Sequence, residues 1–142
     1  MIRLQRVIDT LPAEFETLRT EAGSEGYRML DTLAAEWASG AMHFNRPGEA
    51  LLAAYAGDIL AGIGGFTLEP TITGALRMRR FYVRAAYRRG GVGRILASAL
   101  LDQPRRNGGT VTANAAAGSE AFWEALGFIP AARDTYTHIL NG

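Results

Sequence analysis

The chain contains neither cysteine nor lysine among its 142 residues. Without cysteine it has no disulfide bond, no thiolate metal ligand and no thiol that could carry an acyl group. Without lysine, every fixed positive side chain is an arginine, whose planar guanidinium binds carboxylates and phosphates through paired hydrogen bonds. The same absence excludes a P-loop, which needs a lysine after its last glycine.

Long apolar segments are also missing. No run approaches the roughly 18 residues that span a bilayer, and residues 1–7 show no secretory signal. Hydrophobic residues make up 48% of the chain and charged residues 20%, which is typical of a globular protein. We therefore expect one domain over residues 1–142, located in the cytoplasm and without contact to a membrane.

Positive charge is concentrated in the second half of the chain. Residues 1–75 contain five arginines and ten acidic residues, whereas residues 76–142 contain ten arginines and four acidic residues. Seven arginines and no acidic residue lie between Pro70 and Leu101. This clustering predicts an anionic ligand. The net charge of +1 and the lack of interleaved exposed aromatics argue against nucleic acid as that ligand.

The hydrophobic pattern predicts a mixed α/β fold. Strands are expected over residues 2–8, 51–56, 59–68, 75–83, 110–114 and 135–140. Helices are expected over residues 11–22, 27–37, 94–103 and 119–126. The helix between the strands at 75–83 and 110–114 predicts a crossover between parallel neighbours, so the sheet should be mixed.

Glycine, proline and serine mark specific features within these elements. The three glycines at 62, 64 and 65 indicate a bulge or a close backbone approach within their strand. Pro104 is expected to end the third helix, and Ser119 to cap the fourth.

The segment from Tyr87 to Arg94 is rich in glycine and arginine and lies between a predicted strand and a predicted helix. Glycines let backbone N–H groups approach a phosphate, and a helix N-terminus and arginines supply positive charge. A dinucleotide-binding fingerprint would need a third glycine at Leu96, and it normally follows the first strand of a parallel sheet. The pattern Arg88-x-x-Gly91-x-Gly93 therefore predicts a diphosphate site of another kind.

At these residues the chain resembles the GNAT superfamily of acyl-CoA-dependent N-acyltransferases. The family's pyrophosphate loop reads Gln or Arg, two residues, Gly, one residue, Gly or Ala, after a strand that often ends in Tyr-Val. Tyr82-Val83 and the segment Arg88 to Gly93 match this pattern. A second family element, which ends in Leu-Gly-Phe, is matched by Ala121 to Phe128. The resemblance implies a central mixed, mostly antiparallel sheet flanked by about four helices.

The resemblance also implies acetyl-CoA as co-substrate and no metal. Backbone groups of the strand that ends in Phe81, Tyr82 and Val83 would bind the pantetheine arm. Asn114 would face the pantetheine or the thiol end, with a simple strand-end turn residue as the alternative, and Trp123 would pack around the cofactor arm or in the core. The pyrophosphate would bind the loop formed by Arg88, Arg89, Gly90, Gly91, Val92, Gly93 and Arg94.

Two catalytic side chains that occur in the family are absent from this sequence. A glutamate base found in some members would fall at Arg77, and a tyrosine acid would fall at Trp123. A guanidinium stays protonated and an indole N–H only donates a hydrogen bond, so neither replaces the missing group. Glu69, at the end of the preceding strand, is a candidate base, with a solvated turn residue as the alternative. Both histidines, His43 and His138, are expected at the surface.

The arginine-rich strand at 75–83 suggests a substrate. Strict alternation places Arg77, Arg79, Phe81 and Val83 on one face and Met78, Arg80 and Tyr82 on the other. If one face borders the acceptor pocket, Arg79 would favour an amine that carries a carboxylate. A solvated strand face is the alternative.

We therefore expect an acetyl-CoA-dependent N-acetyltransferase that transfers acetyl directly to a primary amine of a small molecule or peptide. No cysteine is present to carry an acyl group, which favours the direct route. A non-catalytic acyl-CoA-binding or sensing module is the alternative. Nucleic acid and membrane are not expected as partners, and the resemblance allows a homodimer, because dimers are frequent in the family.

Overall fold

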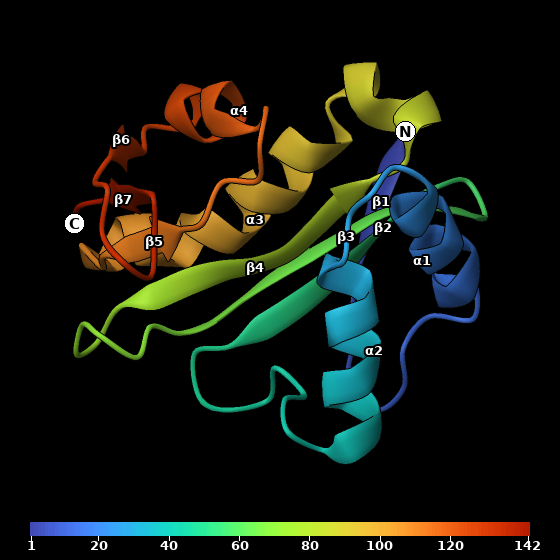
Figure 1. Cartoon of the computed structure of the whole chain (residues 1–142), viewed down its shortest axis with the longest axis horizontal. Helices are drawn as coiled ribbons and strands as arrows, with labels where there is room; N and C mark the ends of the chain where they lie inside the picture. The colour runs from blue at the N-terminus through green and yellow to red at the C-terminus, as the bar shows by residue number, and fades with distance from the viewer.

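The chain folds around one seven-stranded sheet with the strand order β1-β2-β3-β4-β5-β7-β6 (Figure 1). The structure is a computed structural model and describes residues 1–142. The strands are β1 (Ile2–Arg6), β2 (Ala50–Ala56), β3 (Ile59–Leu68), β4 (Leu76–Val83), β5 (Val111–Ala113), β6 (Ile129–Pro130) and β7 (His138–Leu140). The helices are α1 (Phe15–Ser24), α2 (Met29–Ser39), α3 (Val92–Asn107) and α4 (Glu120–Ala125), with a short 3-10 helix, η1 (Ala85–Gly90), before α3.

Only one pair of neighbouring strands, β4 and β5, is parallel, and every other pair is antiparallel. This confirms the predicted mixed, mostly antiparallel sheet and the parallel neighbours linked through α3. None of the helices combines the length and the apolar character that crossing a membrane requires.

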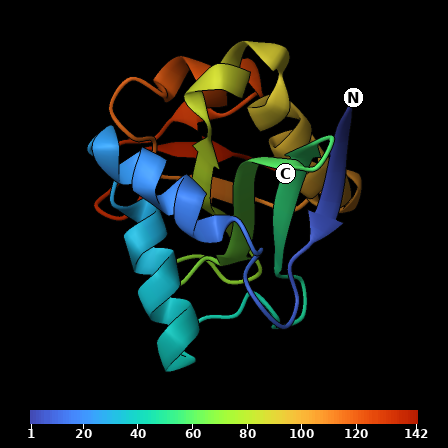
Figure 2. The same ribbon diagram turned by 90° about the vertical axis from the view of Figure 1, so that its right-hand side faces the viewer.

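Helices cover both faces of the sheet, and each face has its own hydrophobic core (Figures 1 and 2). On one face α1 and α2 bury Leu18 and Leu33 against Ile63 of β3. On the other face α3 and α4 pack over the central strands, with Leu101 and Val111 fully buried. The strand β4 therefore lies between two helical layers, which brings residues from both halves of the chain to it.

Glycines in β3 allow the neighbouring strands to pack closely. A Cβ atom on Gly65 would lie 2.4 Å from the carbonyl oxygen of Ala50, and one on Gly64 would lie 2.7 Å from the ring of Phe81. The register shifts at this point, because Arg80 and Phe81 of β4 both lie opposite Gly64. The predicted bulge and close backbone approach are thus confirmed.

The bulge breaks the predicted alternation of side chains along β4. Arg80 has a positive φ of 62°, and its side chain binds Glu36 of α2. Met78 packs in the core under α3, whereas Tyr82 packs in the core under α1 and α2. The prediction that Met78, Arg80 and Tyr82 share one face is therefore wrong, because one extra residue in the strand reverses the order of faces.

Two helix ends also differ from their predictions. Pro104 lies inside α3, which continues to Asn107 and ends at Gly108, where φ is 68°. A proline removes one helical hydrogen bond, and packing of the buried face of α3 outweighs that loss. The hydroxyl of Ser119 donates to the carbonyl oxygen of Ala116 (2.8 Å) and does not cap α4.

The strands β4 and β5 pair at only two positions, Leu76 with Val111 and Arg77 with Thr112. Beyond these positions the edge of β4 that faces β5 has no strand neighbour, from Met78 to Val83. Unpaired N–H and C=O groups along such an edge are available to an extended ligand. The C-terminal strand β7 begins at His138, three residues later than predicted.

Candidate functional site

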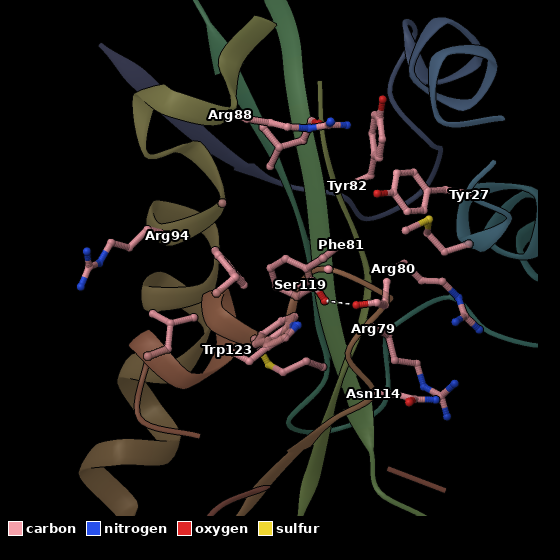
Figure 3. A pocket seen from close by; sticks show the side chains of 18 of the residues that line it. Tyr27, Arg79, Arg80, Phe81, Tyr82, Arg88, Arg94, Asn114, Ser119 and Trp123 are labelled. Atoms are coloured by element: carbon pink, nitrogen blue, oxygen red, sulfur yellow. Dashed lines mark hydrogen bonds between the residues drawn. The ribbon is translucent and has the colours of Figure 1, made fainter. Parts of the chain in front are cut away.

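A cavity of about 760 Å³ lies where β4 and β5 cease to pair. It is lined by β4, the N-terminus of α3, the segment after β5 and helix α4, with Tyr27 from the turn before α2 and Met29 from the start of α2 (Figure 3). A volume of this size is typical of sites for small molecules and cofactors.

Most of the predicted cofactor residues line this one cavity. Nine of them do so: Phe81, Tyr82, Val83, Arg88, Gly91, Gly93, Arg94, Asn114 and Trp123. Arg89 and Gly90 lie exposed in η1, outside the cavity lining. Val92 is buried beside Leu96 in the core, so its side chain cannot reach a ligand. The structure thus places nine of the predicted residues around one cavity. Which part of the cofactor each of them binds stays a prediction.

The loop between η1 and α3 presents a helix N-terminus to the cavity. Gly91 is in the left-handed conformation, with φ of 79°, and no side chain caps the helix that follows it. A Cβ atom on Gly93 would lie 3.1 Å from the ring of Phe122, so glycine allows α3 and α4 to approach closely. The first N–H groups of an α-helix have no partner within the helix and carry partial positive charge. This part of the cavity can therefore hold an anion.

The side chain of Arg88 ties the loop to α1 in this structure. Its guanidinium donates to both carboxylate oxygens of Glu25, at 2.8 and 2.5 Å, and its Nε donates to the carbonyl oxygen of Val83 at 3.0 Å. The hydroxyl of Tyr82 donates to Glu25 and to Glu21, the latter at 3.0 Å. Burial raises the pKa of Tyr82, and these two carboxylates raise it further.

The acidic partners of this cluster were not identified from the sequence. Glu21, in α1, and Glu25, the residue that follows α1, lie about one helical turn apart, a spacing that the sequence shows. Their partners are about 60 residues away along the chain, so no local pattern pairs them with Arg88 or Tyr82. Hydrogen bonds from Arg88 and then Tyr82 lower the pKa of Glu25. Burial alone would raise the pKa of Glu21, but hydrogen bonds from Ala85, Tyr82 and Arg84 lower it.

Three arginines of β4 line the cavity, and they differ in their partners. Arg80 forms two hydrogen bonds with the carboxylate of Glu36, at 3.1 and 2.9 Å. Arg77 lies 3.8 Å from a carboxylate oxygen of Glu69. Arg79 forms no ion pair, and its Nε donates to the hydroxyl of Thr67 at 2.8 Å.

Glu69, the candidate base, lies outside the cavity lining and is buried. Its carboxylate accepts hydrogen bonds from the N–H and hydroxyl of Thr71, both at 2.7 Å, and from the hydroxyl of Thr112 at 2.8 Å. Burial would raise the pKa of Glu69, but these hydrogen bonds lower it. A carboxylate held in this way is a poor proton acceptor. The geometry therefore gives Glu69 a structural role, in holding β4 and β5 together.

Neither histidine reaches the cavity. His138 is buried, which corrects the expected surface position. Its Nε2 lies 2.9 Å from a carboxylate oxygen of Glu124, so it links β7 to α4. His43 bonds the carbonyl oxygen of Trp37. No aspartate, glutamate or histidine lines the cavity.

Trp123 forms part of the cavity wall. It is 6% exposed, and three phenylalanine rings surround it at centroid distances of 5.1 Å (Phe81), 4.9 Å (Phe122) and 5.4 Å (Phe128). All three meet its ring edge to face, a favourable arrangement of aromatic side chains. This placement supports the interpretation that Trp123 is a packing residue.

Solved structures of other proteins have the same fold as this chain. A protein of Exiguobacterium sp. 255-15 described as a candidate acetyltransferase has 20% identity and a TM-score of 0.89, over 99% of this chain and 93% of that chain. The ribosomal-protein-S18-alanine N-acetyltransferase of Escherichia coli has 14% identity and a TM-score of 0.67, over 98% and 89%. A Salmonella typhimurium protein, described as a candidate acetyltransferase and solved with acetyl-CoA, has 17% identity and a TM-score of 0.66, over 99% and 93%.

Because the sequence identities to these structures are low, the structural similarity establishes the fold alone. No curated protein matches the chain. Residues 19–140 match the family model described as the acetyltransferase (GNAT) domain, which covers most of the chain. The chain therefore belongs to the GNAT family of acetyltransferases.

Proposed function

We propose that this protein transfers acetyl from acetyl-CoA directly to a primary amine of a small molecule or peptide. The observation that carries the proposal is the cavity, in which an uncapped helix N-terminus and an open strand edge line one space. Family membership supplies the class of reaction. Acetyl-CoA, when bound, supplies the thioester from which the acetyl group is transferred.

The residues around the cavity suit the parts of acetyl-CoA. The N–H groups at the start of α3 offer hydrogen bonds and positive charge to a pyrophosphate. The edge of β4 from Met78 to Val83, apart from the Val83 carbonyl that accepts from Arg88, offers backbone groups to the amides of the pantetheine arm, much as a sheet edge accepts an added strand. Phe81 and Trp123 form an apolar wall beside that edge.

Deprotonation of the amine is the step for which the cavity supplies no side chain. Neutralising an alkylamine with a pKa of about 10.4 at pH 7 costs about 4.6 kcal/mol, whereas an amine with a pKa of about 8 costs only about 1.4 kcal/mol. Positive charge from the arginines of β4 lowers the pKa of a bound ammonium. We therefore propose that the proton leaves to water and that amines of low pKa are the better acceptors.

The departing thiolate also has no dedicated acid. A thiol with a pKa of about 8.5 is a tolerable leaving group without protonation. Correct alignment of two bound reactants contributes about 7 to 11 kcal/mol to catalysis, more than the loss of one acid removes. Direct transfer can therefore proceed with Trp123 in place of a tyrosine.

Thiol release from acetyl-CoA over a panel of amines tests the proposal. Release should require the amine, and its pH dependence between about pH 6 and about pH 10 should follow the pKa of the amine and not that of a protein group. Protein incubated with acetyl-CoA alone should carry no acetyl group.

A non-catalytic acyl-CoA-binding module is the second candidate, and the lack of a carboxylate or imidazole in the cavity favours it. If calorimetry shows that acetyl-CoA binds, but no amine of the panel causes thiol release, this candidate is supported and acetyl transfer is rejected.

A further inference from the structure

We infer that the acetyl acceptor carries a carboxylate, which binds Arg79 where β4 and β5 cease to pair. The inference rests on the proposed function, because it names the substrate class of the same cavity. It follows from the balance of charges along β4, the free hydrogen-bond donors of Arg79 and the position of Asn114.

Charge along the cavity side of β4 is balanced except at one residue. Arg77 lies beside Glu69, and Arg80 is bound by both oxygens of Glu36. Arg79 has no acidic partner, so it leaves one positive charge uncompensated in the cavity wall. Burial and the neighbouring charges of Arg77 and Arg80 lower the pKa of Arg79, and the carboxylates of Glu36 and Glu69 offset this only in part. A half-buried charge of this kind is stabilised by an anion, and the cavity supplies none of its own.

The guanidinium of Arg79 is held ready for a ligand. Its Nε donates to the hydroxyl of Thr67 at 2.8 Å, and Thr67 is 3% exposed, so the direction of the side chain is fixed. The two terminal nitrogens of Arg79 form no hydrogen bond with the protein. A planar guanidinium whose two terminal nitrogens are both free pairs well with the two oxygens of a carboxylate.

Asn114 lies on the other side of the same opening. Arg77 pairs with Thr112 in the parallel register, so Arg79 and Asn114 each lie two residues beyond the last pair. Both line the cavity, and Figure 3 shows them toward the end remote from Arg88. The amide of Asn114 adds a hydrogen-bond donor beside the two free terminal nitrogens of Arg79.

This anion site is separate from the helix N-terminus at which a pyrophosphate would bind. Val83 lies four positions beyond Arg79 in β4, which is about 13 Å along a regular strand. Among the arginines of β4 only Arg79 is uncompensated, and one positive charge matches a carboxylate, which carries one negative charge, better than a phosphate monoester, which carries nearly two. The acceptor is therefore expected to be an amine with a carboxylate, such as an amino acid.

The first experiment compares amino acids with their carboxamides as acceptors, at saturating acetyl-CoA. The wild type should prefer the carboxylates by about 10- to 100-fold in kcat/KM, the range expected for hydrogen bonds to a charged group. Arg79→Gln should lose this preference through a higher KM. Arg46→Gln, which removes an exposed arginine outside the cavity lining, should keep it. An equal effect of Arg79→Gln on acids and amides would overturn the inference.

A second variant and an acceptor that carries a phosphate instead of a carboxylate complete the test. Asn114→Ala alters an exposed residue at the cavity and should weaken the preference about threefold to tenfold without loss of folding. O-Phosphoethanolamine should be a poorer acceptor than the amino acids. A preference for this phosphate over the carboxylates would overturn the inference.

A binding experiment distinguishes failure of this inference from failure of the proposed function. N-acetyl amino acids and their amides are titrated calorimetrically into the protein loaded with coenzyme A, which requires no turnover. Tighter binding of the carboxylates, lost in Arg79→Gln, supports the site even if no amine is acetylated. Equal binding of acids and amides rejects the site even if amines are acetylated.

Discussion

Trp123 shows how one residue can belong to the cavity wall without taking part in proton transfer. Its ring is enclosed by three phenylalanine rings and still borders the cavity. The indole N–H donates a hydrogen bond but does not ionise at neutral pH, so it cannot serve as a general acid, and we assign the residue to packing. Together with Phe81 it forms part of the cavity wall.

Replacement of Trp123 tests this assignment. Trp123→Ala should lower the free energy of unfolding by about 3 to 5 kcal/mol, because it leaves a large void among the aromatic rings. Trp123→Phe should keep thiol release within about tenfold of the wild type, whereas loss of a true acid would cost about 10²- to 10⁴-fold. Urea unfolding and steady-state rates measure the two effects. A hundredfold loss of kcat in Trp123→Phe with unchanged stability would contradict the assignment.

At the scale of elements, α1 and η1 are joined by a cluster of two acids, two arginines and a tyrosine. Glu25 binds Arg88, Glu21 binds Arg84 at 3.2 Å, and both acids accept from Tyr82. The cluster fixes η1, the element that leads directly into the N-terminus of α3. We expect it to position the loop at which the pyrophosphate would bind.

Glu25→Gln should destabilise the protein at neutral pH by about 1 kcal/mol, a modest value because the ion pair is partly exposed. The pKa of Glu25 is lowered in the folded protein, so its contribution is present above its ordinary pKa of 4.5. The contribution is lost as the pH falls through the lowered pKa, and the difference between wild type and variant should shrink as the pH is lowered below 4.5.

Urea unfolding of both proteins at neutral and acid pH measures this difference. Asp58→Asn, in the turn between β2 and β3, is a control that removes a negative charge outside the cluster. A difference for Glu25→Gln that stays constant with pH would reject the ion pair as its source.

Elements with a strong local signal were predicted closely from the sequence. The strand β3 has the predicted bounds, and its glycines mark the observed bulge. The consequence of the bulge for β4 was not predicted, because the extra residue at Arg80 depends on the pairing of two strands and not on either strand alone. The prediction that Pro104 ends the helix was wrong for a related reason, because tertiary packing holds α3 together beyond Pro104.

At the scale of the whole molecule, the acidic first half and the basic second half of the chain pair with each other. Of the seven arginines between Pro70 and Leu101, four form ion pairs with acids of the first half: Arg77, Arg80, Arg84 and Arg88. The clustering of arginine was predicted to indicate a ligand, and part of it serves the fold instead. Arg79, Arg89 and Arg94 form no ion pair and remain for a ligand.

The candidate site could be located from the sequence because its motifs are contiguous. The loop around Gly91 and Gly93 and the element around Trp123 are each short runs of sequence, and both line the cavity. The partners of Arg79, Arg80 and Arg88 come from distant segments, so which arginine is free could not be deduced before the fold was known.

The proposed function requires that the cavity beside β4 bind acetyl-CoA with its pyrophosphate at the start of α3. Calorimetric titration of coenzyme A into the wild type, Gly91→Phe and Gly74→Phe tests it most directly. The two glycines have nearly equal φ, 79° and 80°, and neither has an atom within 4 Å of an added Cβ, but only Gly91 lines the cavity.

Strain from a positive φ should therefore be similar in the two variants. We predict 1:1 binding by the wild type and Gly74→Phe, and an affinity at least about tenfold lower for Gly91→Phe, because its side chain would fill the space beside the helix N-terminus. An unchanged affinity of Gly91→Phe for coenzyme A, or an equal loss of affinity in both variants, would contradict binding of the pyrophosphate at the start of α3.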